Sequence, residues 1–243
     1  MTEPGSLLRS LAGRTTARNF HSYVINEIGA GVIAGRFPIG STLPNDAALM
    51  AEFDVSRTVL REALKTLEAK GLLEARPKVG TKIAKRSRWN LFDPQVLAWH
   101  LDAPPDPEFR TGMQDMRRTL EPMAAARAAA KRTADQVRLF QYWIRQMEMS
   151  LDAPQNFALA DFELHRIIAD ASHNPFMRTF SGVIELSHAF AYLPHVQNPD
   201  PKRLEPFFLL HRDLVHAIER SDEQAAERAV LATIDHDEAE GLR

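Results

Sequence analysis

Histidines gather in the second half of the chain, where seven of the nine lie after residue 156. Asp161 and His165 are four residues apart, so on a helix they share a face with the apolar Leu164 and Ile168. His211 also falls within an apolar stripe. Carboxylate and imidazole groups on such faces need polar partners. Either the three bind one divalent ion (zinc, nickel or manganese), or they form a buried Asp–His hydrogen bond beside a second, satisfied histidine.

Arg117 is a second charged residue on an apolar face, because it shares its helical stripe with Met113 and Leu120. A guanidinium in that position needs an anion, and its planar fork matches a carboxylate. Glu121, one turn along the helix, could supply that carboxylate. A bound ligand that carries a carboxylate is the other possibility.

The stretch from residue 56 to 71 carries a different chemistry, because a cationic edge adjoins a buried stripe. Ser56 is suited to cap the start of this helix, and Gly71 to end it. The apolar stripe comprises Leu60, Ala63, Leu64 and Leu67, and the polar edge comprises Arg57, Thr58, Arg61 and Lys65. Such a helix suits a DNA major groove, although an ordinary amphipathic surface helix has the same pattern.

The segments on either side decide between these interpretations. They predict a helix over residues 21–35, a short helix over 45–53, and strands over 72–76 and 81–84. The short connection at residues 54–55 forces a sharp turn between two helices, which is a helix-turn-helix. The turn between the strands carries Lys78 and Gly80, and Lys78 is placed to reach the DNA backbone. Together these elements predict a winged helix-turn-helix.

The rest of the chain reads as a connector and a helical domain. We expect an N-terminal arm over residues 1–20, the winged helix over 21–86, a packed linker over 87–105 with a short helix from Pro94 to Leu101, and an all-helical domain over 106–243. Its predicted helices cover residues 108–131, 134–151, 157–171, 175–191, 205–220 and 222–242, with Pro194 among the breaks. An antiparallel bundle is the economical architecture, so the fold class is mainly α.

Charge and composition agree with a polyanion-binding module joined to a different domain. Residues 1–90 hold 14 Lys and Arg against 8 Asp and Glu, and the remainder holds 16 against 24, so balances of +6 and −8 make up the total of −2. The chain has no cysteine, which fits a reducing compartment. It has no long apolar run and no secretory signal, so we expect a cytoplasmic protein without membrane contact.

Residues 40–81 resemble the DNA-binding domain of GntR-family bacterial transcription regulators over a long run without gaps. The resemblance implies that Ser56, Arg57, Thr58 and Arg61 meet operator bases and phosphates, and that Gly80 is the wing-tip glycine. Many relatives have an arginine where this chain has Ala47, so one DNA contact is expected to be missing and the operator cannot be inferred.

Segments of the helical domain resemble, in order, the FCD ligand-binding domain of the fatty-acid-regulator branch of that family. The resemblance implies metal ligands at Asp161, His165 and His211, but the fourth ligand position is Thr233. His236 lies one turn further along and could substitute, while water or effector could complete a three-ligand site; the absence of a metal is equally open. The resemblance also implies that Arg117 faces an effector cavity, which favours a carboxylate ligand.

These observations predict a homodimeric repressor whose binding to double-stranded operator DNA is controlled by a small carboxylate in the helical domain. Effector-binding candidates are Arg117, Asp161, His165 and His211. The linker resembles that of regulators of galactonate and related sugar-acid catabolism, which implies a sugar acid. Two alternatives are a metal-dependent hydrolase with a DNA-binding appendage, which lacks an obvious general base, and an architectural DNA binder without an effector.

Overall fold

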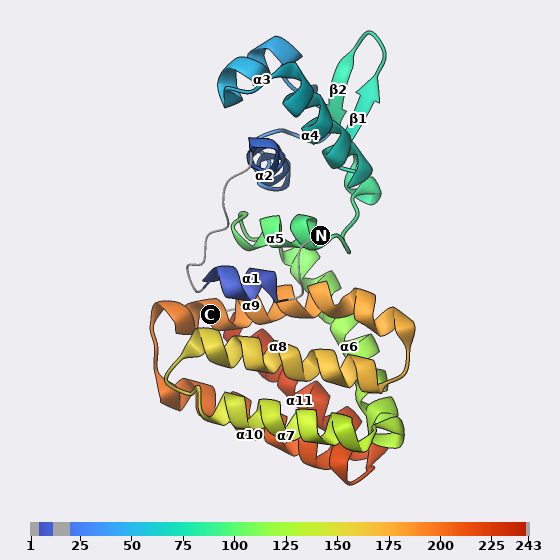
Figure 1. The fold of residues 1–243 in the computed structure, drawn as a ribbon, viewed down its shortest axis with the longest axis vertical. Coiled ribbons are helices and arrows are strands. Elements are labelled where there is room, and N and C mark those ends of the chain that lie inside the picture. Colours follow the sequence, from blue (N-terminus) through green and yellow to red (C-terminus); the bar gives the residue numbers. More distant parts are fainter. Residues whose placement is uncertain (1–4, 12–19, 242–243) are drawn as a thin grey trace. The chain divides into compact units, whose positions relative to one another are not determined.

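A computed structural model describes residues 5–11 and 20–241 of the chain. Its contacts divide into two compact units, one of residues 15–105 and the other of residues 106–243 together with the first helix, α1 (Ser6–Leu11) (Figure 1). Residues 1–4 and 12–19 of the predicted arm and residue 242 of the predicted last helix lie outside the described residues.

The N-terminal unit is a winged helix-turn-helix, as the sequence predicts. Its elements are α2 (Phe20–Ile33), α3 (Asp46–Phe53), α4 (Arg57–Ala69), β1 (Leu73–Arg76), β2 (Gly80–Ile83), a 3-10 turn η1 (Arg86–Arg88) and α5 (Pro94–Leu101). The Ser56 hydroxyl oxygen accepts the Val59 N–H at 3.4 Å and starts α4. Gly71 follows the helix with φ of +79°, a left-handed conformation that suits glycine. Local chemistry therefore fixes both ends of this helix.

The wing is a two-stranded antiparallel hairpin in which Leu73 pairs with Ile83 and Arg76 with Gly80. Lys78 lies in the turn with φ of +65°. A single further bridge joins Thr42, in the segment before α3, to Lys82. The hairpin is thus tied to the start of the helix-turn-helix as well as to its end.

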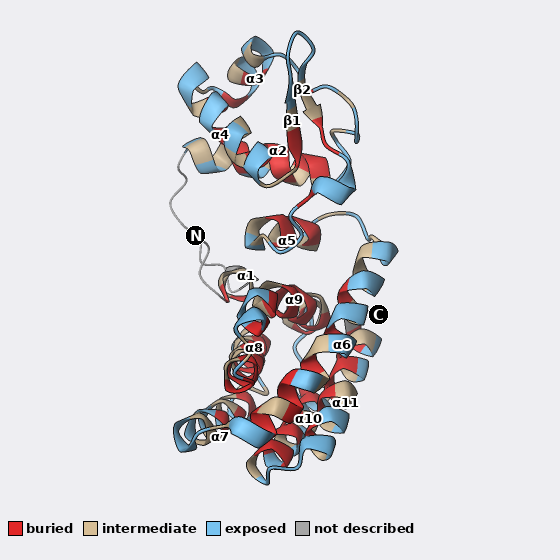
Figure 2. Cartoon of the chain, turned by 90° about the vertical axis from the view of Figure 1, so that its right-hand side faces the viewer, coloured by how far each residue is buried: buried red, intermediate tan, exposed pale blue. Residues whose placement is uncertain are grey.

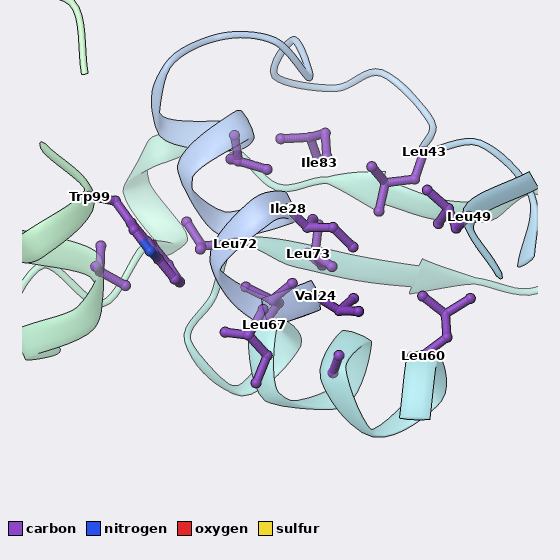
Figure 3. Packing of buried hydrophobic residues seen from close by; sticks show 14 of the residues in the cluster. Val24, Ile28, Leu43, Leu49, Leu60, Leu67, Leu72, Leu73, Ile83 and Trp99 are labelled. Atoms are coloured by element: carbon purple, nitrogen blue, oxygen red, sulfur yellow. The ribbon is translucent and has the colours of Figure 1, made fainter. Parts of the chain in front are cut away.

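One apolar core holds the N-terminal unit together. α4 buries Leu60, Ala63 and Leu67 and exposes its other face (Figure 2). These side chains pack against α2 and the wing (Figure 3). Trp89 and Trp99 join the same core. The segment after the wing therefore packs on the winged helix, and α5 spans the residues expected for the linker helix.

The second unit is an all-helical bundle. Its helices are α6 (Pro107–Lys131), α7 (Ala134–Glu148), α8 (Pro154–Ala171), α9 (Ser181–Gln197), α10 (Pro201–Glu219) and α11 (Glu223–Gly241), with a 3-10 segment η2 (Pro175–Phe180) before α9. The prediction of one helix over 175–191 is wrong at both ends. Residues 175–180 form the 3-10 segment, and α9 continues through Pro194 because the following turn places His195 in the core, where its side chain is fully buried.

The N-terminal helix α1 belongs to the helical unit, where it packs on α8 and α9. Leu8 is buried, and the Glu185 carboxylate of α9 accepts the Leu7 N–H at 2.7 Å. Burial raises the pKa of Glu185. The sequence predicted only an arm here, because the residues that receive α1 lie far away in the chain.

Among the described residues, no helix is both long and apolar enough to cross a membrane.

Candidate DNA interface and buried histidine cluster

All the side chains of α4 that were predicted to contact DNA lie on its exposed face. Arg57, Thr58, Arg61 and Lys65 are all exposed. Arg61 lies 3.7 Å from the Asp46 carboxylate with 62% of its side chain exposed, and Lys65 lies 2.9 Å from Glu62 with 71% exposed. Surface ion pairs of this kind contribute little energy, so both cations can exchange their partners for phosphates.

The wing adds a second exposed cation and a glycine. Lys78 and Gly80 are both exposed, and Gly80 has φ of +106°. A Cβ at Gly80 would lie 3.2 Å from the Thr42 methyl group, so a side chain would crowd the base of the wing as well as strain the backbone. Ser56 is exposed too, but its hydroxyl oxygen is already used to cap α4. Its position at the helix start leaves the hydroxyl hydrogen available to a phosphate.

In the helical unit, the sequence-predicted trio Asp161, His165 and His211 is brought together from α8 and α10. Asp161 Oδ1 lies 2.9 Å from His211 Nε2 and 3.5 Å from His165 Nε2, and the two Nε2 atoms are 3.1 Å apart. All three residues are buried. Zinc–nitrogen bonds of about 2.0–2.1 Å place neighbouring ligand atoms roughly 3 Å apart, so these spacings fit the edges of a coordination polyhedron.

The outer nitrogens of both histidines face acceptors. His165 Nδ1 lies 2.8 Å from Glu121 Oε2, and His211 Nδ1 lies 2.7 Å from the Phe207 carbonyl oxygen. A proton on each Nδ1 would face these acceptors and would leave a lone pair on each Nε2 of the neutral rings. Two lone pairs and a carboxylate oxygen then point at one another, so the cluster needs a cation at its centre, either a proton on one ring or a metal ion.

Arg117 lies in the core of the same unit, where it is fully buried. Its Nε donates to Glu121 at 2.5 Å, and its Nη1 donates to Asp237 at 2.8 Å and to the Ser187 hydroxyl at 2.7 Å. Glu121 is the partner that the sequence offered; Asp237, on α11, was missed because its partner lies 120 residues away. The buried Nη2 has no hydrogen-bond partner among the described residues, so one edge of the guanidinium remains unused.

The two networks share Glu121 and form one charged interior. The three buried carboxylates of Glu121, Asp161 and Asp237 share this interior with a single guanidinium, which leaves two negative charges to be balanced. Burial alone would raise the pKa of Glu121, but Arg117 and His165 outweigh it and lower that pKa to about 2. Two protonated histidines or one divalent cation would balance the charge.

A further histidine of the cluster, His188 on α9, was missed by the sequence prediction. Its Nδ1 lies 3.8 Å from Asp161 Oδ2 and its Nε2 lies 3.8 Å from Asp237 Oδ2. Asp161, His165 and His188 form a group whose ligand atoms lie within 4.8 Å of one another. Burial lowers the pKa of His188 to about 4, which keeps the ring neutral. The only indication of its role is its position in α9, a helix that is buried on most sides (Figure 2).

Comparison with known proteins decides the family. Residues 21–83 match the family described as bacterial regulatory proteins, gntR family, and residues 113–236 match the FCD domain. The galactonate operon transcriptional repressor of Escherichia coli K12 is 30% identical over 87% of this chain and 92% of its own. This chain is a GntR-family transcription regulator with an FCD domain. Regulators of this family bind operator DNA and respond to small molecules through the FCD domain.

Other relatives of the GntR-family regulator are also named as transcription regulators and align over most of their length. The uncharacterized regulator YieP of E. coli K12 is 30% identical over 92% of this chain and 96% of its own, and the repressor NanR of Salmonella newport is 29% identical over 93% and 87%. A solved structure of Listeria monocytogenes Lar has a TM-score of 0.64 at 15% identity over 94% of this chain and 99% of its own, which shows the fold.

Two residues considered for the fourth ligand position of this GntR-family regulator lie in other contacts. Thr233 is buried, and its hydroxyl donates to the Val230 carbonyl oxygen at 2.8 Å. His236 packs its ring against Phe207 with centroids 4.3 Å apart. It lies beside His195, whose pKa burial and neighbouring cations lower. The Nε2 of His236 is buried and has no hydrogen-bond partner among the described residues.

Proposed function

We propose that this regulator is a repressor released from its operator by a polyhydroxy carboxylate, a sugar acid, bound in the helical unit. The observation that carries the proposal is the mixture of unsatisfied polar atoms in its core. Buried atoms without a hydrogen-bond partner among the described residues include Arg117 Nη2, Gln114 Oε1 and Asp237 Oδ1. Such atoms are costly unless something hydrogen-bonds to them.

The mixture of donors and acceptors matches a sugar acid better than a fatty acid. The free edge of the Arg117 guanidinium suits a carboxylate. Hydroxyl groups donate hydrogen bonds, so they match the carboxylate of Asp237 and the amide oxygen of Gln114. A fatty acid could satisfy the guanidinium with its carboxylate, but its hydrocarbon chain would leave the other atoms unsatisfied. The relative that is named a galactonate operon repressor supports the same class of effector.

Effector binding requires the core to open. The cavity beside Glu121 and His165 has a volume of about 10 Å³, whereas small-molecule sites usually measure about 300–1,000 Å³. A carboxylate that binds Arg117 must compete with Glu121 and Asp237, which hold it in the closed state. This competition gives the effector different affinities for two states, which is the requirement for a ligand-controlled switch.

We further propose that Asp161, His165 and His211 bind a divalent metal ion such as zinc, nickel or manganese. The converging lone pairs and the two unbalanced negative charges support this assignment. A divalent cation would neutralise the interior and offer open coordination positions to oxygen ligands. Glu121 and the Phe207 carbonyl would hold the two imidazoles in the required tautomer.

We also propose a role at the operator for each exposed residue of α4 and the wing. Arg57, Thr58 and Arg61 would read the major groove from α4, while Lys65, Lys78 and the backbone near Gly80 would contact phosphates. A homodimer would place two such helices on a palindromic operator. The named relatives are transcription regulators, which supports this function over a metal-dependent hydrolase.

The test measures operator binding by fluorescence anisotropy with DNA from the promoter region of the regulator's own gene. Galactonate should release the DNA, whereas galactose, which lacks the carboxylate, and octanoate, which lacks the hydroxyls, should not. Arg61→Ala should abolish operator binding. Arg138→Ala, an exposed arginine on α7, is the matched control and should retain it. Release by octanoate alone would exclude the sugar-acid proposal, and DNA binding that ignores every carboxylate would favour an architectural binder.

A further inference from the structure

The fourth protein ligand of the proposed metal site does not come from the position that the family resemblance assigns to it. The position that the family resemblance assigns to it holds Thr233, whose hydroxyl is a neutral and weak ligand already donated to a backbone carbonyl. His236 stacks edge-on with Phe207 in the neighbourhood of His195. Neither residue of α11 supplies a nitrogen to the Asp161 group.

His188 of α9 has the properties of the missing ligand. Its side chain is fully buried, and neither ring nitrogen has a hydrogen-bond partner among the described residues. A neutral imidazole with both nitrogens unsatisfied is costly to bury, so it needs a ligand or a metal. Its Nδ1 lies on the Asp161 side, 3.8 Å from Oδ2, and its ring meets that of His165 edge-on with centroids 5.1 Å apart.

The other nitrogen of His188 also lies on the side of a carboxylate, although at a longer distance than at His165. His165 has one nitrogen in the cluster and the other beside a carboxylate, Glu121. His188 has Nδ1 toward Asp161 and Nε2 toward the Asp237 carboxylate at 3.8 Å. Histidines that bind metals almost always give their second N–H to such a partner. On the last helix, Asp237 is therefore positioned to become such a partner if the His188 ring shifts toward it when a metal binds.

We propose that His188 is the fourth protein ligand of the metal ion held by Asp161, His165 and His211. The inference rests on the proposed metal site and deepens it. It also connects the metal to the effector contact, because Asp237 Oδ2, which accepts from the Arg117 guanidinium, lies 3.8 Å from the outer nitrogen of His188. An effector that displaces Asp237 from Arg117 alters the support of a metal ligand, so metal and effector affinities are coupled in both directions.

Titration of the metal-free full-length protein with Zn²⁺ and Co²⁺ tests the inference. Calorimetry gives the zinc affinity, and the visible absorption of Co²⁺ reports its coordination number. Wild-type protein should bind one Zn²⁺ and give the intense Co²⁺ bands of a four-coordinate site. His188→Ala should weaken zinc binding by at least about 10-fold and reduce the Co²⁺ intensity. His236→Ala is the matched control and should change neither quantity.

Three outcomes distinguish the role of His188 from the existence of the metal site itself. Wild-type protein that binds no Zn²⁺ overturns both. Zinc binding lost in His165→Ala but unchanged in His188→Ala overturns the role of His188 alone and leaves a three-ligand site. If His188→Ala does not fold, His188→Gln replaces it, because the amide keeps the volume and polarity but removes the imidazole ligand. Recovery of zinc affinity in His188→Ala on adding Thr233→His would support the inference, because the second change restores a fourth nitrogen.

Discussion

The two units of this regulator use charge in opposite ways. The winged helix keeps its cations outside: Arg61 and Lys65 are mostly exposed and paired only across the surface, above a core of aliphatic and aromatic side chains. The FCD unit also buries charges in its core, with Arg117 and Asp161 at zero exposure. Exposed charges bind a large polyanion with little consequence for folding, whereas buried charges make folding itself sensitive to what occupies the core. The first unit is therefore suited to bind DNA, and the second is suited to respond to a ligand in its core.

The largest expected effect compares an arginine from each unit. Arg117→Ala leaves Glu121 and Asp237 buried without their counter-charge, and breaking a buried ion pair in this way destabilises by about 3–5 kcal/mol. Arg61→Ala should change stability by less than about 0.5 kcal/mol while abolishing operator binding. Urea denaturation of both variants, followed by circular dichroism, measures the difference. Equal stability of the two variants would mean that the Arg117 network is not closed in solution.

Protonation offers the second test, performed in the presence of a chelator. Folded His188 has its pKa lowered from 6.5 to about 4, so its neutral form is favoured on folding. The stability it contributes is complete above pH 6.5 and is lost as pH falls toward 4, by about 3 kcal/mol. His211 acts in the opposite sense: burial lowers its pKa, but Asp161 outweighs burial and raises it, so its contribution is present at low pH and lost as pH rises.

The comparison of wild-type with His188→Gln isolates the first contribution, because His211 is common to both proteins. The variant should lose less stability than wild-type between pH 6.5 and 4. Hydrogen exchange followed by mass spectrometry locates the change, since peptides from residues 106–241 should show it and peptides from residues 20–105 should not. A parallel loss in wild-type and variant would assign the acid sensitivity to other groups.

Much of the winged helix was predictable because its determinants are local. Ser56 and Gly71 mark the ends of one helix, and the turn that carries Lys78 separates two short strands. Each signal spans a few residues, and the family resemblance runs through them without a gap. The long FCD helices were predictable for the same reason. The end of α9 was not, because burial of His195 keeps the helix continuous through Pro194.

The buried cluster was only partly predictable. Asp161 and His165 were found because they are one turn apart on a single helix, and Glu121 was found as a neighbour of Arg117. Asp237 and His188 reach the cluster from α11 and α9, and nothing in their own sequence segments marks them. Tyr192, which donates to Asp161 at 2.7 Å, was missed for that reason too. Residues that reach the site from other helices, such as Asp237 and His188, have no neighbour in their own segments that marks the site.

A pair of glycines tests whether the winged helix depends on close backbone packing as well as on exposed charge. Gly71 and Gly40 have φ of +79° and +81°. A Cβ at Gly71 would lie 1.9 Å from the Arg88 carbonyl oxygen, whereas at Gly40 it would meet nothing within 4 Å. Both alanine variants bear the left-handed backbone cost of about 1–2 kcal/mol. Gly71→Ala adds overpacking of about 1–3 kcal/mol, so thermal denaturation should rank it clearly below Gly40→Ala.

The smallest expected effect concerns the exposed surface itself. Ala47 lies exposed on α3, where the family resemblance places an arginine that contacts DNA. Ala47→Arg should leave folding unchanged, because the position has no core to disturb. If the arginine reaches a phosphate, operator affinity should rise by about 1 kcal/mol and the slope of log affinity against log salt should steepen by about one. Anisotropy titrations across a salt series measure both quantities. An affinity gain without a steeper slope would mean that the new side chain contacts a base edge, so the variant distinguishes a missing phosphate contact from altered sequence recognition.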